Sequence, residues 1–156
     1  MDDRLALNAL RDMLRTELTD PYTQYSSTSR QWIHTDIILP SATFPRIQIG
    51  KKGETLIKNI SIGFDYWEER TLPVDIWFKT KTGFKYKIED NSYLSNEEFI
   101  KYYQQEILDA IKTNSQFFHD NYRFYVRLIS NDEPKQDEEF QQYYGRVTVN
   151  LIYYRK

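Results

Sequence analysis

Hydrophobic residues recur at three- and four-residue spacing between positions 95 and 114, and the rest of the chain is organised around this stretch. Its apolar positions are Phe99, Ile100, Tyr103, Ile107, Leu108 and Ile111. Such a stripe is typical of a helix that buries one face. Ser95 and Glu98 have the spacing of a capping box, and Asn114 suits a left-handed residue that ends a helix. We predict a helix here, packed against a sheet, because strand-like stretches flank it.

A second stripe near the start predicts a helix over residues 2–18. Asp2 or Asp3 can cap it, and Pro21 ends it, because the residue before a proline is pushed out of helical geometry. The polar, Ser/Thr-rich residues that follow predict a loop over 22–30, and residues 32–39 then predict a short strand, followed by a turn at Pro40.

Elsewhere apolar and polar residues alternate, which is the pattern of a strand with one packed face. The predicted strands cover residues 45–49, 60–67, 74–79, 122–128 and 146–154. The predicted turns lie at 50–53, 68–71 and 82–83, and residues 84–94 form a connector with room for a short strand at 84–88. The polar, acidic residues 130–142 predict a long loop.

These elements together predict an α+β fold, a two-layer sandwich in which a mainly antiparallel sheet carries two helices on one face. A length of 156 residues, without an internal repeat or a linker, predicts one domain over 1–156. The aromatic content is 16%, with 13 Tyr and 9 Phe, and tyrosine suits half-buried sheet faces and subunit contacts.

Charge and composition exclude several classes of binding partner and site. A net charge of −2 gives no basic excess for sequence-independent binding to nucleic acid or anionic lipid. The chain has no cysteine, which excludes disulfides, thiolate metal sites and a cysteine nucleophile. No apolar run reaches the length of a membrane span, and the first residues lack the order of a signal peptide. We therefore expect a protein that is used without secretion and has no membrane partner.

The sequence offers little catalytic chemistry. His34 and His119 have no second ligand at metal spacing, and the chain has neither a glycine-rich phosphate loop nor a G-x-S-x-G elbow. Gly50-Lys51-Lys52-Gly53 fits a hairpin turn, and the adjacent acids Glu68 and Glu69 point apart on a strand. We expect no catalytic residue, no metal, no cofactor and no enzymatic activity.

One strand face leaves an alternative open. Arg123, Tyr125 and Arg127 alternate along one predicted strand, and Arg146 and Tyr154 lie on another. Cationic and aromatic side chains on one face can bind nucleic acid. The acidic segment nearby and the net charge favour instead an ordinary half-exposed face, or one that a neighbouring subunit buries.

Four stretches carry a resemblance to a known family. These are the N-terminal helix before a polar loop, the two-proline segment Ile37-Ile38-Leu39-Pro40 through Phe44-Pro45-Arg46-Ile47, the strand Leu72-Pro73-Val74-Asp75-Ile76-Trp77, and the ending from Gly145 to Arg155. In the order and residue pattern of these four stretches, the chain resembles the tail-terminator, or tail-completion, proteins of long-tailed phages and related archaeal viruses.

The resemblance implies a structural virion protein without an active site. Such proteins form a ring, usually a hexamer, at the head-proximal end of the tail tube, where the ring ends tube polymerisation and docks the tail to the head. The implied partners are further copies of the chain, the tail tube protein, head connector or neck proteins, and genomic DNA that passes through the lumen without specific binding. The implied location is the virion, after assembly in the host cytoplasm. The alternatives are another head–tail neck or connector subunit, or a nucleic-acid-binding α+β module.

Two sets of residues are candidates for these contacts. Half-exposed Trp and Tyr side chains suit a ring interface, and the subunit-contact candidates are Trp67, Trp77, Tyr125 and Tyr154. Negative charge repels phosphate and also suits a basic neighbour, and the candidates for a lumen or docking loop are Asp132, Glu133, Asp137, Glu138 and Glu139.

Overall fold

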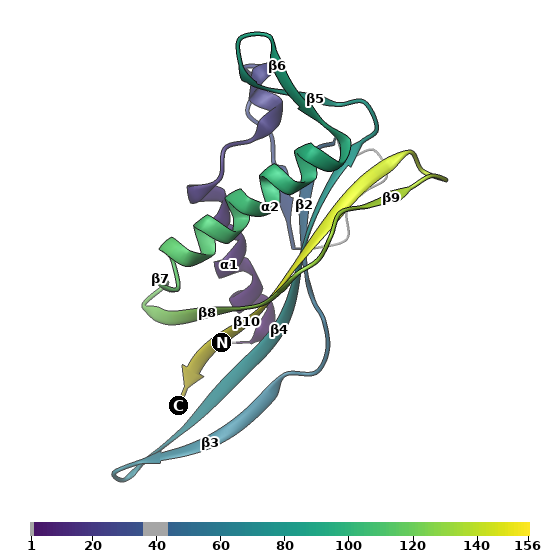
Figure 1. Cartoon of the computed structure of the whole chain (residues 1–156). Coiled ribbons are helices and arrows are strands. Elements are labelled where there is room, and N and C mark those ends of the chain that lie inside the picture. The colour runs from purple at the N-terminus through teal and green to yellow at the C-terminus, as the bar shows by residue number, and fades with distance from the viewer. Residues whose placement is uncertain (1, 36–43) are drawn as a thin grey trace.

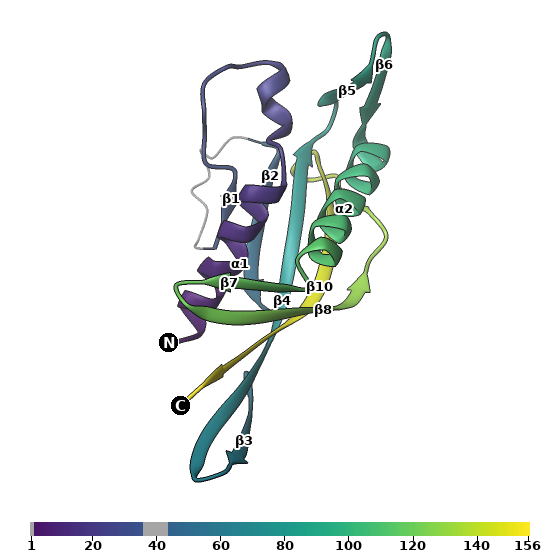
Figure 2. The ribbon, with the colours of Figure 1, turned by 90° about the vertical axis from the view of Figure 1, so that its left-hand side faces the viewer.

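The computed structural model of the chain describes residues 2–35 and 44–156. It shows a mixed α/β fold with two helices and a large, mostly antiparallel, curled sheet (Figures 1 and 2). This coarse prediction is confirmed. The far half of the predicted strand 32–39 and the predicted turn at Pro40 lie outside the described residues. Within them, only Ile33–His34 is a strand at this point (β1).

Both predicted helices are present. Helix α1 covers Asp3–Glu17, and the side chain of Asp2 accepts a hydrogen bond of 3.0 Å from the backbone N–H of Leu5. A 3-10 helix, Pro21–Gln24, follows where a loop was predicted. Helix α2 covers Asn96–Thr113. The predicted stripe of α2 is buried except for Leu108, which is half-buried.

Ser95 and Asn114 are the cap residues of α2, as predicted, but the predicted capping box and the left-handed geometry are wrong. The Ser95 side chain makes no capping hydrogen bond, because Ser95 is the last residue of a strand paired with Lys85 and the chain passes directly from strand to helix. Asn114 has a φ of −114°, which is not left-handed. Its side-chain amide instead donates to the carbonyl of Ala110 at 3.0 Å, which closes the last turn.

The main sheet follows the order β1-β2-β4-β10-β8-β7, with β3 paired to β4 and β9 paired to β10. Its further strands are β2 (Arg46–Lys51), β3 (Leu56–Ile62), β4 (Asp65–Lys81), β7 (Gln116–His119), β8 (Tyr122–Asn131), β9 (Lys135–Asp137) and β10 (Gln142–Arg155). Among the strands in the described residues, only β1 and β2 pair in parallel. The connector before α2 is a small hairpin of β5 (Lys85–Glu89) and β6 (Ser92–Ser95).

The core lies on one face of the two longest strands. On β10 the predicted inward residues Val147, Val149, Leu151 and Tyr153 are all buried, and so are Leu72, Val74, Ile76 and Phe78 of β4. The ring of Phe78 stacks on that of Tyr103 of α2, with 4.7 Å between their centroids. Gly145 allows α2 to approach β10 closely, because a Cβ there would lie 2.6 Å from side-chain atoms of Gln104 and Ile100.

Two predicted turns are misplaced. Residues 60–67 are not one strand, since the chain reverses at Gly63, whose φ of +62° suits a residue without a Cβ. Residues 68–71 are not a turn, because β4 continues through them and pairs with Ile152–Arg155 of β10. Gly50 and Lys51 belong to β2, so the predicted 50–53 turn begins too early. Figure 1 shows that β3 and the first half of β4 project from the body as an arm.

The acidic stretch 130–142 is also more ordered than a loop. Strand β8 runs to Asn131, and β9 pairs with Gln142, Tyr143 and Tyr144 at the start of β10. Because β10 begins four residues earlier than predicted, it offers an edge on which β9 can form. Strand β7 was not predicted; it completes a hairpin with β8 that lies across the direction of β4 (Figure 2).

Candidate subunit interface

All four aromatic candidates lie on the sheet face opposite the core. Trp67 and Trp77 alternate with the buried positions of β4, and the strand registers place Tyr154 and Tyr125 on the same side as Trp67. Each of the four is half-buried. The four candidates therefore share one face of the sheet, and their role in subunit contacts stays a prediction.

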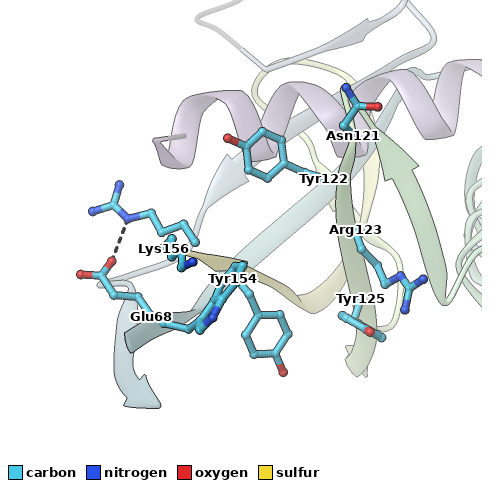
Figure 3. Close-up of a pocket in the computed structure, with 9 residues that line it drawn as sticks. Glu68, Asn121, Tyr122, Arg123, Tyr125, Tyr154 and Lys156 are labelled. Atoms are coloured by element: carbon cyan, nitrogen blue, oxygen red, sulfur yellow. Dashed lines mark hydrogen bonds and ion pairs between the residues drawn. The ribbon is translucent and has the colours of Figure 1, made fainter. Parts of the chain in front are cut away.

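Three of the four surround one groove of about 640 Å³, which we call the terminal groove (Figure 3). Trp67, Tyr125 and Tyr154 line it, and the rings of Tyr125 and Tyr154 meet edge to face with 6.2 Å between centroids. Trp77 is separate, ten residues further along β4, where its ring lies 5.7 Å from that of Tyr144. The structure thus divides the candidates into a groove and a second aromatic pair.

The terminal groove exists because two strands part. Strands β8 and β10 are paired as far as Phe124 and Tyr153, and beyond this point Tyr154 and Arg155 pair only with β4. The start of β8, from Tyr122 to Tyr125, forms one wall. The ends of β4 and β10 form the other, where Figure 3 shows Glu68, Tyr154 and Lys156.

Most charges around the groove are already paired. Glu68 accepts a hydrogen bond of 2.7 Å from Arg155 and one of 3.1 Å from Arg70, and these bonds lower the pKa of Glu68. Lys156 lies 3.2 Å from Asp65. The Tyr154 hydroxyl donates to Glu69 at 2.9 Å, and this bond raises the pKa of Tyr154.

Arg123 differs from these residues. Its guanidinium lies over the ring of Phe118, 4.8 Å from the centroid, and within residues 2–35 and 44–156 it forms no ion pair. Arg127 is exposed two positions beyond Tyr125 on β8, and it too forms no ion pair within these residues. The predicted row of Arg123, Tyr125 and Arg127 therefore shares one strand face, and Arg123 and Tyr125 of this row line the groove. Arg146 does not join it, because it lies near Trp77, with 5.2 Å between guanidinium and ring centroid.

The β3–β4 arm is a feature that sequence reasoning missed. Its exposed large side chains are Leu56, Ile57, Phe64 and Tyr66, and Phe64 at the turn is fully exposed. A glycine between two alternating apolar runs is the signal that could have located this hairpin.

The five acidic candidates do not act as one group. Asp132 is held by Arg146, with 2.5 Å between Nη2 and Oδ2, and Glu133 is exposed, 3.8 Å from Lys101. Asp137 ends β9. Glu138 and Glu139 are exposed in the turn between β9 and β10, beside Phe140, which is 63% exposed. We call residues 138–140 the acidic tip.

Other sites for chemistry are few in the part of the chain that the structure describes. There, no three His, Cys, Asp or Glu side chains gather as a metal site would require. His119 lies 3.0 Å from Asp12 and 3.5 Å from Asp120. Burial, helped by nearby Arg15, lowers the pKa of His34. Neither described helix has the length and apolar character needed to cross a bilayer.

Comparison with known proteins assigns no family to this chain. No protein-family model matches the sequence, and no curated protein matches it.

Proposed function

We propose that this protein is a structural ring subunit of the tail-terminator kind, which ends a viral tail tube and docks it to the head. The proposal takes the fold as a two-layer sandwich, with both helices on one sheet face and the other face free for neighbours. The observation that carries it is the β3–β4 arm, which extends away from the body and exposes its apolar side chains.

An arm with exposed apolar side chains and an open edge strand is unfavourable in a chain that stays isolated in water. Phe64 and Tyr66 are mostly solvent-exposed, and the exposed Leu56 and Ile57 of β3 belong to the same projecting hairpin. Large exposed apolar patches mark interaction sites, and an unprotected edge strand such as β3 invites pairing with another chain. An interface between different surfaces of identical subunits generates a ring when its rotation closes.

The acidic residues fit the same proposal. Glu133, Glu138 and Glu139 are exposed and lie on one end of the sheet. In a ring, such charges face either the lumen, where they repel passing DNA, or an adjoining ring. In this proposal the partners are the tail tube protein and head connector or neck proteins, and the location is the virion.

The test is the molar mass in solution, measured by light scattering across a range of concentrations. We expect a closed oligomer for the wild type and dissociation in the variant Phe64→Ser/Tyr66→Ser. The matched control is Tyr93→Ser, an exposed aromatic on β6 outside the arm, which should keep the wild-type mass. An image of a particle that places the protein away from the head-proximal end of the tail would refute the terminator role and favour another neck position.

A nucleic-acid-binding module is the second candidate. Arg123 and Arg127 flank Tyr125 on an open strand face and have no ion-pair partner in the described ranges. A stable monomer that binds single-stranded oligonucleotide, with affinity lost in Arg123→Gln/Arg127→Gln, would favour this function over the ring.

A further inference from the structure

We infer that the acidic tip of one copy docks into the terminal groove of the next copy in the ring. This inference rests on the proposed function, since it supposes that identical subunits associate. It adds the two surfaces that meet and the direction in which the subunits follow one another.

The groove offers both apolar and cationic contacts. Trp67, Tyr125 and Tyr154 provide aromatic surface, and the space between the walls exceeds one aromatic side chain. Arg123 lines the same groove without a carboxylate partner in the described part of the chain. An aromatic anchor flanked by carboxylates is the ligand that this combination favours.

The acidic tip has that composition. Phe140 is exposed, and Glu138 and Glu139 on the preceding positions are exposed and form no ion pair within the described residues. The tip is also held in shape, since the Asp137 carboxylate accepts from the backbone N–H of Phe140 at 3.4 Å and β9 is paired with β10. The opposite charges of tip and groove complement each other.

The tip and the groove of one chain cannot meet. They lie at opposite ends of β10, whose 14 residues span about 45 Å at the usual rise per residue (Figure 1). Docking therefore joins the start of β10 in one copy to the end of β10 in the next copy, which is a head-to-tail contact. Such a contact forms a ring if the rotation closes, as the proposed function requires, and a filament otherwise.

Two other occupants fit the groove less well. Nucleic acid would meet Glu68 and Asp65, whose carboxylates already neutralise Arg155 and Lys156. The arm of a neighbour has Phe64 at its turn but presents one carboxylate, Asp65, which is engaged with Lys156. Of these three occupants, the acidic tip is the one that brings carboxylates without an ion-pair partner in the described residues to Arg123.

The experiment uses two full-length variants with complementary defects. Glu138→Gln/Glu139→Gln/Phe140→Ser removes the tip and keeps the groove. Arg123→Glu removes the groove cation that has no carboxylate partner in the described residues and keeps the tip. Each alone should raise the concentration needed for assembly by about tenfold or more. The control Glu54→Gln/Glu89→Gln/Tyr93→Ser removes the same groups from exposed positions elsewhere and should assemble like the wild type.

An equimolar mixture of the two variants gives the decisive result. One variant retains a working tip and the other a working groove, so the mixture should form a 1:1 dimer that cannot grow. Circular dichroism confirms that each variant is folded, and Arg123→Gln replaces Arg123→Glu if the charge reversal unfolds the chain.

Several results would overturn the inference. Variants that assemble like the wild type would exclude this contact and leave the ring itself intact. Monomeric variants whose mixture stays monomeric would exclude head-to-tail docking. Binding of single-stranded DNA that Arg123→Gln abolishes, with self-association unchanged, would assign the groove to nucleic acid. A wild type that is monomeric at every concentration would exclude tip docking in the isolated chain, whereas the place of the protein in a particle tests the terminator role separately.

Discussion

The carboxylate of Asp3 connects helix α1 to the base of the arm, and its replacement by Asn gives the sharpest test of the fold. Its Oδ2 lies 3.0 Å from Nζ of Lys51 and accepts from the Thr55 hydroxyl at 2.5 Å. Its Oδ1 accepts from the Tyr153 hydroxyl at 3.0 Å. One side chain thus joins the first turn of α1 to β2, to the segment before β3 and to the buried end of β10.

The effect on stability follows from the pKa of Asp3. Partial burial alone would raise this pKa, but the hydrogen bonds from Thr55, Lys51 and Tyr153 lower it from its ordinary 3.8 to about 2. A carboxyl group whose pKa is lower in the folded state stabilises that state above its unfolded pKa and ceases to do so as the pH falls through the folded value. The lowered pKa corresponds to a stabilisation of about 2 kcal/mol at pH 7 and about 1 kcal/mol at pH 3.

The assay is urea unfolding of the wild type and Asp3→Asn at pH 7 and at pH 3. We expect the variant to be less stable by about 1–2 kcal/mol at pH 7, because Asn keeps some hydrogen bonds but not the charge, and by roughly half as much at pH 3. Asp90→Asn is the control, since this carboxylate is 96% exposed. A difference between wild type and Asp3→Asn that is equally large at both pH values would refute the electrostatic reasoning.

Three further predictions concern the core and the acidic tip. Ile107→Asp should unfold the domain, because a charge at this fully buried position costs several kcal/mol. Thermal unfolding followed by circular dichroism checks this prediction. A cooperative transition would mean that α2 buries another face. Gly145→Ala should lower the free energy of unfolding by about 1–3 kcal/mol, because the new Cβ overlaps the Gln104 side chain; an unchanged urea midpoint would contradict this. Glu138→Gln/Glu139→Gln should change the stability of the monomer by less than about 0.5 kcal/mol, since both positions are exposed. A larger loss in urea unfolding would show that the tip supports the fold.

The elements with a strong hydrophobic period were the ones that the sequence predicted well. Helix α2 and the inward row of β10 each repeat buried residues over three or more positions, and both are present as expected. Helix α1 ends at Glu17, ahead of Pro21 as predicted, and Asp20 before the proline has the extended backbone that the proline requires. In these cases the local pattern and the tertiary packing agree.

The turn at Gly63 could not be placed from alternation alone. Apolar residues alternate on both sides of it, and a period of two does not reveal where a strand reverses. The position of the turn depends on pairing with β10, whose last residues extend β4 through 68–71. Strands β7 and β9 were missed for a related reason, because each has three or four residues and no apolar row of its own length.

The candidate site was predictable in kind but not in arrangement. Tyrosine and tryptophan at outward positions of strands indicated an exposed aromatic face, and Trp67, Tyr125 and Tyr154 do lie on one. That these three meet in a groove, whereas Trp77 lies elsewhere, depends on the register between β4, β8 and β10, which no local pattern specifies.

The base of the β9–β10 hairpin explains how a polar segment can present a docking surface without a core of its own. Asp132 bonds to Arg146, and its carbonyl accepts a hydrogen bond of 2.8 Å from Gln104, which is only 3% exposed. Arg146 also lies 4.0 Å from Asp75 and packs over Trp77. The hairpin is therefore fixed to α2 and β4 before any partner arrives. A pre-organised segment loses less conformational entropy on binding, which favours the docking that we propose for the three-residue acidic tip.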